Sequence, residues 1–284
     1  MGYGDEIMAT AEAREAKKKF PNAKIVIGDG KKTYPSIIYL NNPNIYQGEI
    51  SPTHNDEYIW VKNYIGHRPY ILGHDKIKNF WNKDFSVIPG DIFFSKEEDQ
   101  KGIFSVNKIK ELWSEKIGKP SNYVVVVEPN VKGPNYAKLV GTNVSGKINK
   151  DWGFEKWQQV INSLKDEITF IQPFKGEVRK LSNVIHVECS FRNAISIINQ
   201  SNLFIGSEGG FSHAAGALKK NAIIVFGGWI SPKITGYEFH ENLYIDIPES
   251  PCGILSKCKH CESCMEKIKV DELISKIIDL KNKS

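Results

Sequence analysis

The stretch "GSEGGFSHAAGAL", residues 206–218, lies between two apolar runs, "LFI" at 203–205 and "IIVF" at 223–226. The apolar runs predict buried strands, and the Ser-, His- and Ala-containing segment between them predicts a helix. An acid and two glycines therefore stand where a strand turns into a helix. Such a turn either serves packing alone, with a capping serine and a packed histidine, or forms the floor of a site for a charged ligand.

The same alternation of strand and helix continues through the second half of the chain. "NYVVVVEP" (122–129) and "ITFIQP" (168–173) predict strands, and residues 191–201 predict a helix. Residues 151–167 predict an amphipathic helix whose apolar positions step by three and four, at Phe154, Trp157, Val160, Ile161 and Leu164. This order is typical of a doubly wound α/β domain, which binds ligands beyond the carboxyl ends of its parallel strands.

The chain divides into two predicted α/β domains, residues 1–118 and residues 119–284. The first begins with an Ala-, Glu- and Lys-rich helix, and its strands are expected at 23–29, 35–41, 57–64 and 90–95. A strand normally precedes the first helix of such a domain, and here none does. Either the true start lies upstream of Met1 or the sheet lacks its usual first strand.

Composition excludes several classes of protein. The 284 residues are 40% hydrophobic and 25% charged, with a net charge of +5 that is spread along the chain. This charge balance does not indicate nucleic-acid binding, and it suits an enzyme with anionic substrates. We find neither an apolar run of membrane-spanning length nor a signal peptide. The sequence therefore predicts a cytoplasmic protein, with any membrane contact peripheral and at the inner face.

Two lysines stand at the predicted ligand edge of the second sheet. Lys147 and Lys150, in "GKINKDW", follow the "VVVV" strand and precede the next helix. The carboxyl ends of parallel strands share one edge, which places these lysines on the same side as Glu208. A lysine there can neutralise a diphosphate. The alternative interpretation is a pair of solvated loop lysines.

A second glycine turn opens the chain, in "GYGDEIM" at residues 2–8. Asp5 is placed near the start of a helix, where the helix dipole favours an ionised carboxylate. A carboxylate that faces a ligand site can act as a general base. The alternative interpretation is that Asp5 only caps the helix.

Four segments together resemble glycosyltransferase family 9, the lipopolysaccharide heptosyltransferases. They are "GYGDEIMATAEAREAKKKFPNAKIVI" (2–27), "NKDWGFEKWQQVINSL" (149–164), "SNLFIGSEGGFSHAAGALKKNAIIVFGG" (201–228) and "CESCMEKIKVDELI" (261–274). The resemblance implies the GT-B fold, two Rossmann-like domains facing a cleft, with the helix at 270–283 near their junction. It implies inverting transfer of a sugar, typically heptose from ADP-heptose, to a lipopolysaccharide or other surface-glycan acceptor. Residues 31–100 match the family poorly.

The resemblance also implies roles for individual residues. Asp5, in the "G-x-G-D" turn with Gly4, matches the catalytic base, and Lys150 matches the lysine that contacts the donor phosphate. The residues that match the donor-binding motif, together with Phe211 at the start of the helix, are Glu208, Gly209, Gly210, Phe211 and His213. Lys147 lies beside Lys150, and Glu177 aligns loosely with a ribose-binding acid.

Two departures leave the donor open. Glu208 replaces the family's usual Asp, and Gly209 replaces a Ser or Thr. The alternatives are therefore the same fold with another nucleotide sugar, or a protein that binds a nucleotide sugar without turnover. A lysine and a helix N-terminus can stabilise the leaving diphosphate, so we expect no cofactor for catalysis. Arg68, in "NYIGHRPYILGH", is a candidate for contact with an anionic acceptor. The alternative interpretation is an arginine that is only exposed at the surface.

Four of the five cysteines lie within thirteen residues of one another. Cys252, Cys258, Cys261 and Cys264 have the spacing C-x5-C-x2-C-x2-C, and His260 lies among them. Four thiolates suit a tetrahedral zinc ion. Iron–sulfur ligation also uses short cysteine spacings, and free packed thiols are the third interpretation. We expect a structural zinc as the metal if the cluster binds one.

Overall fold

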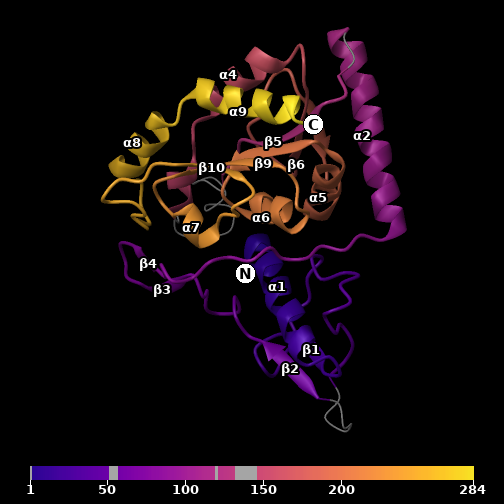
Figure 1. Cartoon of the computed structure of the whole chain (residues 1–284), viewed down its shortest axis with the longest axis vertical. Helices are drawn as coiled ribbons and strands as arrows, with labels where there is room; N and C mark the ends of the chain where they lie inside the picture. Colours follow the sequence, from indigo (N-terminus) through magenta and orange to yellow (C-terminus); the bar gives the residue numbers. More distant parts are fainter. Residues whose placement is uncertain (1, 51–56, 119–120, 132–145) are drawn as a thin grey trace.

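The computed structural model describes residues 2–50, 57–118, 121–131 and 146–284. Figure 1 shows two units, with the larger C-terminal unit above and the N-terminal unit below. The first helix, α1 (Tyr3–Lys19), starts at the boundary between the units and runs away from the C-terminal one. The chain therefore begins its first helix at the place where the two units meet.

A six-stranded parallel sheet forms the centre of the C-terminal unit. Its strands are β5 (Val124–Glu128), β6 (Thr169–Phe174), β7 (Ile185–Glu188), β8 (Leu203–Ser207), β9 (Ala222–Gly227) and β10 (Glu241–Tyr244). They lie in the order β10-β9-β8-β5-β6-β7, and every neighbouring pair is parallel. The strands expected at 122–129 and 168–173 are confirmed. The order reverses beside β5, which is where a doubly wound sheet places its ligand.

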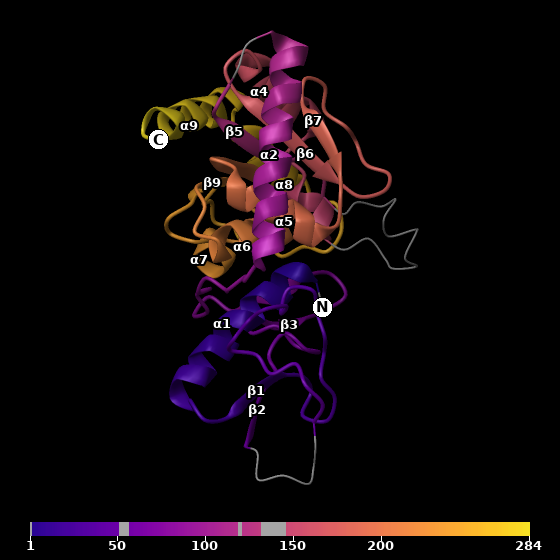
Figure 2. The same cartoon turned by 90° about the vertical axis from the view of Figure 1, so that its right-hand side faces the viewer.

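Helices cover both faces of this sheet. One face packs against α4 (Phe154–Leu164) and α9 (Val270–Asn282) through residues such as Trp157 and Leu273. The other face packs against α2 (Lys96–Ile117), α5 (Phe191–Gln200) and α6 (Gly210–Ala217). Figure 2 shows α2 running along the C-terminal unit. α9 packs on α4 at the far end of the unit, so the expectation that it lies near the junction is wrong.

Shorter elements complete the C-terminal unit. The 3-10 turn η1 (Gly146–Lys150) precedes α4, and α7 (Pro232–Thr235) follows β9. The cysteine-rich segment leads into α8 (Lys259–Lys267), which packs near η1 and β9. These elements gather at the carboxyl edge of the sheet and carry several of the residues discussed below.

The N-terminal unit is smaller and less regular than the expected strands suggest. β1 (Lys24–Ile27) pairs in parallel with β2 (Tyr58–Val61), and β3 (Ile71–His74) forms an antiparallel hairpin with β4 (Asn79–Trp81). The strands expected at 35–41 and 90–95 are absent, because both segments fold as turns and extended loops. Ile38 and Tyr39 are nevertheless buried, so the apolar run contributes to the core without joining a sheet.

The N-terminal core includes residues of the C-terminal unit. α1, β1 and β2 supply residues such as Ile7, Ile25 and Val61, and Ile195 of α5 and Ala214 of α6 belong to the same cluster. The two units therefore share one continuous apolar contact around the start of α1.

The helix α2 joins the two units. Its N-cap, Ser95, accepts from the Glu98 backbone, and Glu98 accepts from the Ser95 backbone in return, which is a capping box. Buried Arg192 of α5 then binds Glu98, with Nη2 donating at 2.9 Å, and also donates to the carbonyl oxygens of Ile37 and Phe93 at 2.7 and 2.6 Å. One arginine thus connects α5, α2 and the N-terminal loops.

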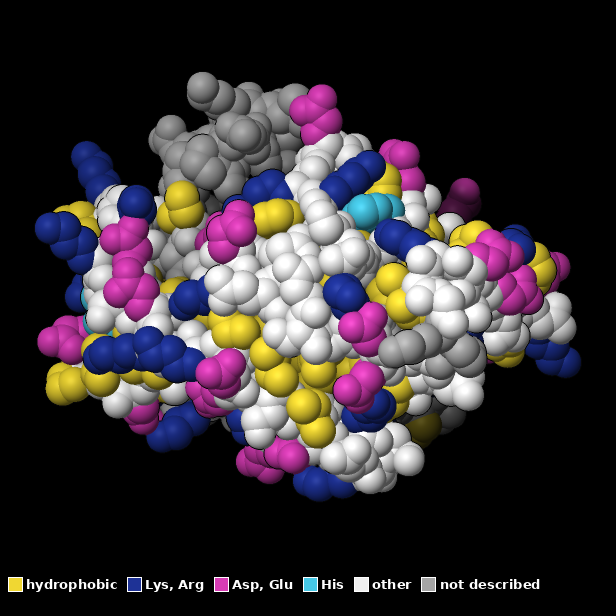
Figure 3. Space-filling model, turned by 90° about the horizontal axis from the view of Figure 1, so that it is seen from above, with side chains coloured by type: hydrophobic (Ala, Val, Ile, Leu, Met, Phe, Trp, Pro, Cys, Tyr) yellow, Lys and Arg dark blue, Asp and Glu magenta, His cyan; other side chains and the backbone are white. Residues whose placement is uncertain are grey.

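Charge is mixed on the outer surface of the C-terminal unit. Figure 3 shows basic and acidic side chains interspersed across the face seen from above. Over the described ranges, each helix is too short or too polar to cross a bilayer.

We predict that Arg192→Lys lowers the free energy of unfolding by about 2 kcal/mol, because a lysine cannot reproduce a planar fork that reaches a carboxylate and two carbonyls. Urea denaturation followed by circular dichroism measures the change. The control is Arg179→Lys, since Arg179 is 46% exposed and pairs with Asp151 at the surface; there the change should stay within about 0.5 kcal/mol. Equal losses in the two variants would contradict the role given to Arg192.

Candidate active site

The turn between β8 and α6 has the form that the sequence predicts. β8 ends at Ser207, Glu208 is buried, and α6 starts at Gly210. A Cβ placed on Gly209 would meet only the carbonyl oxygen of Ser207, at 4.0 Å, so the space beside this residue is open. The first-turn N–H groups and the positive end of the α6 dipole make this a suitable place for an anion.

Glu208 and Lys150 form a buried ion pair. Lys150 Nζ donates to Glu208 Oε2, and the two side chains are 13% and 6% exposed. Lys150 Nζ also lies 4.7 Å from the centre of the Trp229 ring, a cation–π arrangement. Burial alone would raise the pKa of Glu208, but Lys150 and His213 outweigh it and lower that pKa to about 2. Glu208 is therefore an anion at neutral pH.

His213 is held between two groups. Its Nε2 lies 3.5 Å from Glu208 Oε1, and its Nδ1 lies 2.9 Å from the Tyr237 hydroxyl oxygen. Tyr237 in turn packs on Gly216, where a Cβ would lie 2.2 Å from the ring. Both ring nitrogens of His213 thus face protein groups, whereas the sequence-based hypothesis has this residue donate to a phosphate.

Asp5 is buried in the first turn of α1 and has three donors. Arg68 Nε donates to its two oxygens at 3.1 and 3.0 Å, and the Tyr70 hydroxyl donates at 2.7 Å. The backbone N–H of Gly2 donates to Oδ2 at 3.2 Å, so Asp5 also caps its own helix. Arg68 is 47% exposed and Asp5 only 6%, which leaves the pair at the rim of the site.

The starts of α1 and α6 lie against each other. A Cβ on Gly4 would come within 2.8 Å of His213 Cδ2 and 3.6 Å of Gly210 Cα. Next to this contact the ring of Tyr3 stacks on Phe191 at 4.1 Å, and Phe191 stacks on Phe211 at 4.6 Å. The structure therefore brings the Asp5 carboxylate, the α6 start and the Lys150–Glu208 pair into one site.

The remaining predicted residues have other positions. Glu177 is exposed on the loop after β6. Lys147 belongs to η1, and its side chain lies outside the described residues. Phe211 lies in the aromatic stack at the α6 start. Arg68, considered as an acceptor contact from the sequence, binds Asp5 here.

Sequence reasoning missed two aromatic residues of the site, Tyr70 and Trp229. Tyr70 holds Asp5, Tyr237 holds His213, and Trp229 lies beside Lys150. Burial raises the pKa of Tyr70 well above its ordinary value, with Asp5 and Glu208 adding to the effect. Tyr70 therefore remains a hydrogen-bond donor at neutral pH. A tyrosine in a loop carries no spacing signal, so only the fold reveals these partners.

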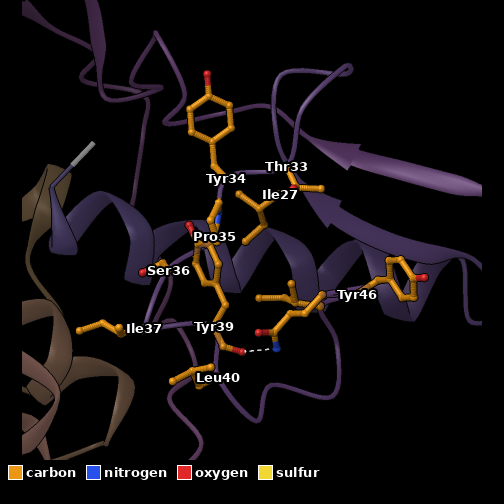
Figure 4. A pocket seen from close by; sticks show the side chains of 11 residues that line it. Ile27, Thr33, Tyr34, Pro35, Ser36, Ile37, Tyr39, Leu40 and Tyr46 are labelled. Carbon is orange, nitrogen blue, oxygen red and sulfur yellow. Dashed lines mark hydrogen bonds between the residues drawn. The ribbon is translucent and has the colours of Figure 1, made fainter. Parts of the chain in front are cut away.

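The pocket drawn in Figure 4 lies in the N-terminal unit beside α1 and has a volume of about 370 Å³. Tyr34, Ser36 and Tyr39 are among its lining residues. Ser36 Oγ donates to Glu6, the neighbour of Asp5. Burial raises the pKa of Tyr39, and the charges of Glu6 and Asp5 add to this effect.

The cysteines form a compact group whose members differ from the expected set. The ligand atoms of Cys252, Cys258, His260 and Cys261 all lie within 4.8 Å of one another. We call these four residues the Cys3His group. Cys264, expected as the fourth ligand, lies outside it, with its sulfur 3.5 Å from His260 Nε2. The side chains could hold a metal ion with histidine in place of the fourth thiolate.

Comparisons with known proteins support the fold. Neither a protein-family model nor a curated protein matches the sequence. The structure of a glycosyl transferase family 9 protein from Veillonella parvula matches with a TM-score of 0.62 and 12% identity, over 100% of this chain and 95% of that one. The chain thus has the GT-B fold, as the sequence predicts.

Two further solved structures match over parts of the chain. ADP-heptose lps heptosyltransferase II from E. coli matches with a TM-score of 0.44 and 12% identity, over 70% of this chain and 56% of that one. The iron-containing dodecameric glycosyltransferase TibC from enterotoxigenic E. coli matches with a TM-score of 0.42 and 14% identity, over 57% and 45%. The fold assignment rests on the Veillonella structure.

We predict that Glu208→Gln lowers the free energy of unfolding by about 3 kcal/mol at pH 7, because it leaves the Lys150 ammonium buried without its anion. The folded-state pKa of Glu208, about 2, lies below its ordinary value of 4.5. Its ionic contribution is therefore complete above about pH 5 and is lost as the pH falls toward 2.

Urea midpoints of wild type and variant between pH 7 and pH 3 measure this effect. The difference between them should be constant down to about pH 5 and then shrink. Glu111→Gln is the control, since Glu111 is exposed and forms a surface pair with Lys108. A difference for Glu208→Gln that stayed constant to pH 3 would disprove the ionic explanation.

Proposed function

We propose that the protein is an inverting glycosyltransferase that moves a sugar from a nucleotide-activated donor to an acceptor hydroxyl. The observation that carries the proposal is the juxtaposition of Asp5, from the N-terminal unit, with the α6 start and Lys150, from the C-terminal unit. A base and an anion-binding group from different units are what a two-substrate transfer requires. The Veillonella fold supports the proposal at the level of architecture.

In the proposed reaction Asp5 takes the proton of the acceptor hydroxyl. The hydroxyl oxygen attacks the anomeric carbon, and the bond from that carbon to the diphosphate oxygen breaks. The electron pair leaves with the nucleoside diphosphate. The donors from Arg68, Tyr70 and Gly2 fix the orientation of the Asp5 carboxylate, so the base is already positioned before the acceptor arrives.

The donor diphosphate is proposed to bind in the open space beside Gly209. The α6 N-terminus and Lys150 supply positive charge there. Lys150 is paired with Glu208, so a bound diphosphate competes with Glu208 for the same ammonium group. Glu208 is then available to accept hydrogen bonds from sugar hydroxyls. These groups stabilise the leaving group themselves, and we propose that transfer uses no cofactor.

The acceptor is proposed to bind in the pocket of Figure 4, where Ser36 donates to Glu6, the residue that follows Asp5 in the chain. Pockets that combine apolar and aromatic walls with a few polar groups suit small organic ligands, and this one offers Tyr34, Tyr39 and Ser36. The Tyr39 hydroxyl is buried without a hydrogen-bond partner in the described chain, and an acceptor hydroxyl would satisfy it. We propose a lipopolysaccharide core or another surface glycan as acceptor, which implies work in the cytoplasm at the inner face of the membrane.

The donor is proposed to be ADP-heptose, on the strength of the sequence motifs at 2–27, 149–164 and 201–228. Another nucleotide sugar is the alternative, because Glu208 and Gly209 depart from the family motif. A protein that binds the donor without turnover is the second alternative. The oriented Asp5 carboxylate favours turnover, since a protein that only binds has no use for a base.

We also propose that the Cys3His group binds a structural zinc ion. Three thiolates and an imidazole form one of the usual ligand sets of tetrahedral structural zinc. The group belongs to the C-terminal unit.

We predict that Asp5→Asn lowers kcat/KM for transfer by at least about 100-fold, because the amide cannot accept the acceptor proton. ADP affinity should stay within about twofold of wild type, since Asp5 lies on the acceptor side of the site. Glu12→Gln, which changes another carboxylate of α1, should keep wild-type turnover. An Asp5→Asn enzyme with unchanged kcat/KM would show that Asp5 is not the base.

We predict that ADP-heptose raises the melting temperature while UDP- and GDP-sugars leave it unchanged, because ligands that bind only the folded state stabilise it. A thermal-shift screen of nucleotide sugars measures this. A shift with UDP- or GDP-sugars alone would assign a different donor to the same fold.

A further inference from the structure

The Cys3His group joins the two ends of a loop that contacts both halves of the active site. We call residues 252–258 the Cys loop; it carries Cys252 and Cys258 and leads into α8 with His260 and Cys261. Zinc with Zn–S bonds of about 2.3 Å holds its sulfur ligands about 3.8 Å apart. Cys252 and Cys261 have their sulfurs 3.2 Å apart, and all four ligand atoms lie within 4.8 Å, so small shifts complete a tetrahedron.

The first contact of the Cys loop is with η1, through Asn149. This residue is buried, and its Nδ2 donates to the carbonyl oxygens of Ile254 and Ser256 at 2.9 and 2.8 Å. Its Oδ1 accepts from the backbone N–H of Cys258 at 3.1 Å. Asn149 therefore binds three backbone groups of the loop, and the next residue in the chain is Lys150.

The second contact is with the segment after β9. The backbone N–H groups of Cys252 and Gly253 donate to the carbonyl oxygens of Gly228 and Trp229, both at 3.1 Å. Trp229 Nε1 donates back to the carbonyl oxygen of Ile254 at 2.7 Å. The Trp229 ring is the one that faces Lys150 Nζ. Lys150 is thus positioned by the Cys loop from two directions.

The third contact is with the β3–β4 hairpin of the N-terminal unit. Asn79 N–H donates to Gly253 O at 2.9 Å, and Leu255 N–H donates to Ile77 O at 2.8 Å. Gly253 has φ +67°, and a Cβ there would lie 2.3 Å from Asn79 O, so this position requires glycine.

The hairpin leads directly to the Asp5 site. Trp81 Nε1 of β4 donates to Trp229 O at 3.0 Å. The Trp81 ring lies 6.5 Å from that of Tyr70, whose hydroxyl holds Asp5. The Cys loop is therefore connected to the Asp5 side of the site as well as to the Lys150 side.

We propose that a metal ion in the Cys3His group fixes the Cys loop as a joint between η1 and the β3–β4 hairpin, and so positions Lys150 and Tyr70 for the reaction. A seven-residue loop whose ends are joined by a metal ion loses less conformational entropy when it becomes ordered than an open loop does. Metal binding then supplies the free energy of folding such a segment. The proposal builds on the zinc assignment and on the donor role of Lys150. It assigns the metal a positioning function and no part in the bond-forming step.

The test uses the full chain purified without chelator. Elemental analysis for zinc and iron measures the metal content, calorimetry measures the Kd for ADP, and hydrogen exchange reports on residues 77–81 and 148–150. We expect about one metal ion per chain. Removal of the metal should raise the Kd for ADP at least about tenfold and speed hydrogen exchange in both segments. Added Zn²⁺ should restore the metal content, the Kd and the exchange rates.

Matched variants separate positioning from folding. Cys258→Ser should have the Kd for ADP and the exchange rates of the metal-free protein, and added Zn²⁺ should not change them. Cys264→Ser should keep the metal and the wild-type Kd and exchange rates. Asn149→Ala leaves every ligand in place; it should retain the metal and still raise the Kd for ADP by about fivefold. Gly253→Ala should retain the metal and speed exchange in residues 77–81.

Three results would overturn the proposal. The first is a chain that takes up no stoichiometric metal after Zn²⁺ addition. The second is a stripped, folded protein whose exchange in both segments is unchanged. The third is an Asn149→Ala protein with the metal retained and unaltered exchange at 148–150. If wild type does not bind ADP, the donor assignment fails, and the metal content and exchange still decide the role of the metal.

Discussion

The first turn of α1 packs directly on the first turn of α6, and the missing side chain at Gly4 makes this contact possible. Every other feature of the site depends on it. It carries Asp5 from one unit to the edge of the sheet in the other, and it places two helix N-termini side by side. Two positive helix ends repel unless negative charge lies near them, and Asp5 and Glu208 provide that charge.

The two carboxylates would repel each other in turn if each lacked a cation. Asp5 has Arg68 and Glu208 has Lys150, so the site is close to neutral as a whole. The pairs differ in exposure, because Arg68 reaches the surface while Lys150 is nearly enclosed. Arg68 is therefore the cation of the site that is more accessible to a ligand in solvent.

Local patterns predicted the C-terminal sheet and the polar residues at its edge, because buried strands and amphipathic helices leave periodic signals. The glycine turns around Gly4 and Gly209 predicted a candidate site, because a glycine beside a helix start is also a local signal, and the structure brings the two turns together. The N-terminal unit was harder. The run at 35–41 is apolar without a neighbouring strand to pair with, so it became a loop in which Ile38 and Tyr39 are buried.

Contacts between distant residues left no trace in the sequence. Arg68 and Tyr70 lie more than sixty residues from Asp5, and neither the β3–β4 hairpin nor the cysteine geometry follows from spacing. The exchange of Cys264 for His260 in the metal-binding group is an example. Residues 259–267 form α8, whose periodicity favours Cys264, three residues from Cys261, over the adjacent His260, so the position of the Cys loop in the fold decides the set.

The apolar cluster shared by the two units bears on how the molecule moves. Ile195 and Ala214 are fully buried against α1, so a rigid rotation that separated the units would expose hydrocarbon to water. Wide interdomain swinging is therefore costly for this chain. Under the proposed function, substrate entry and product release are expected to rely on side-chain and loop rearrangements near the site. The smaller unit is expected to fold only when the larger one is already in place.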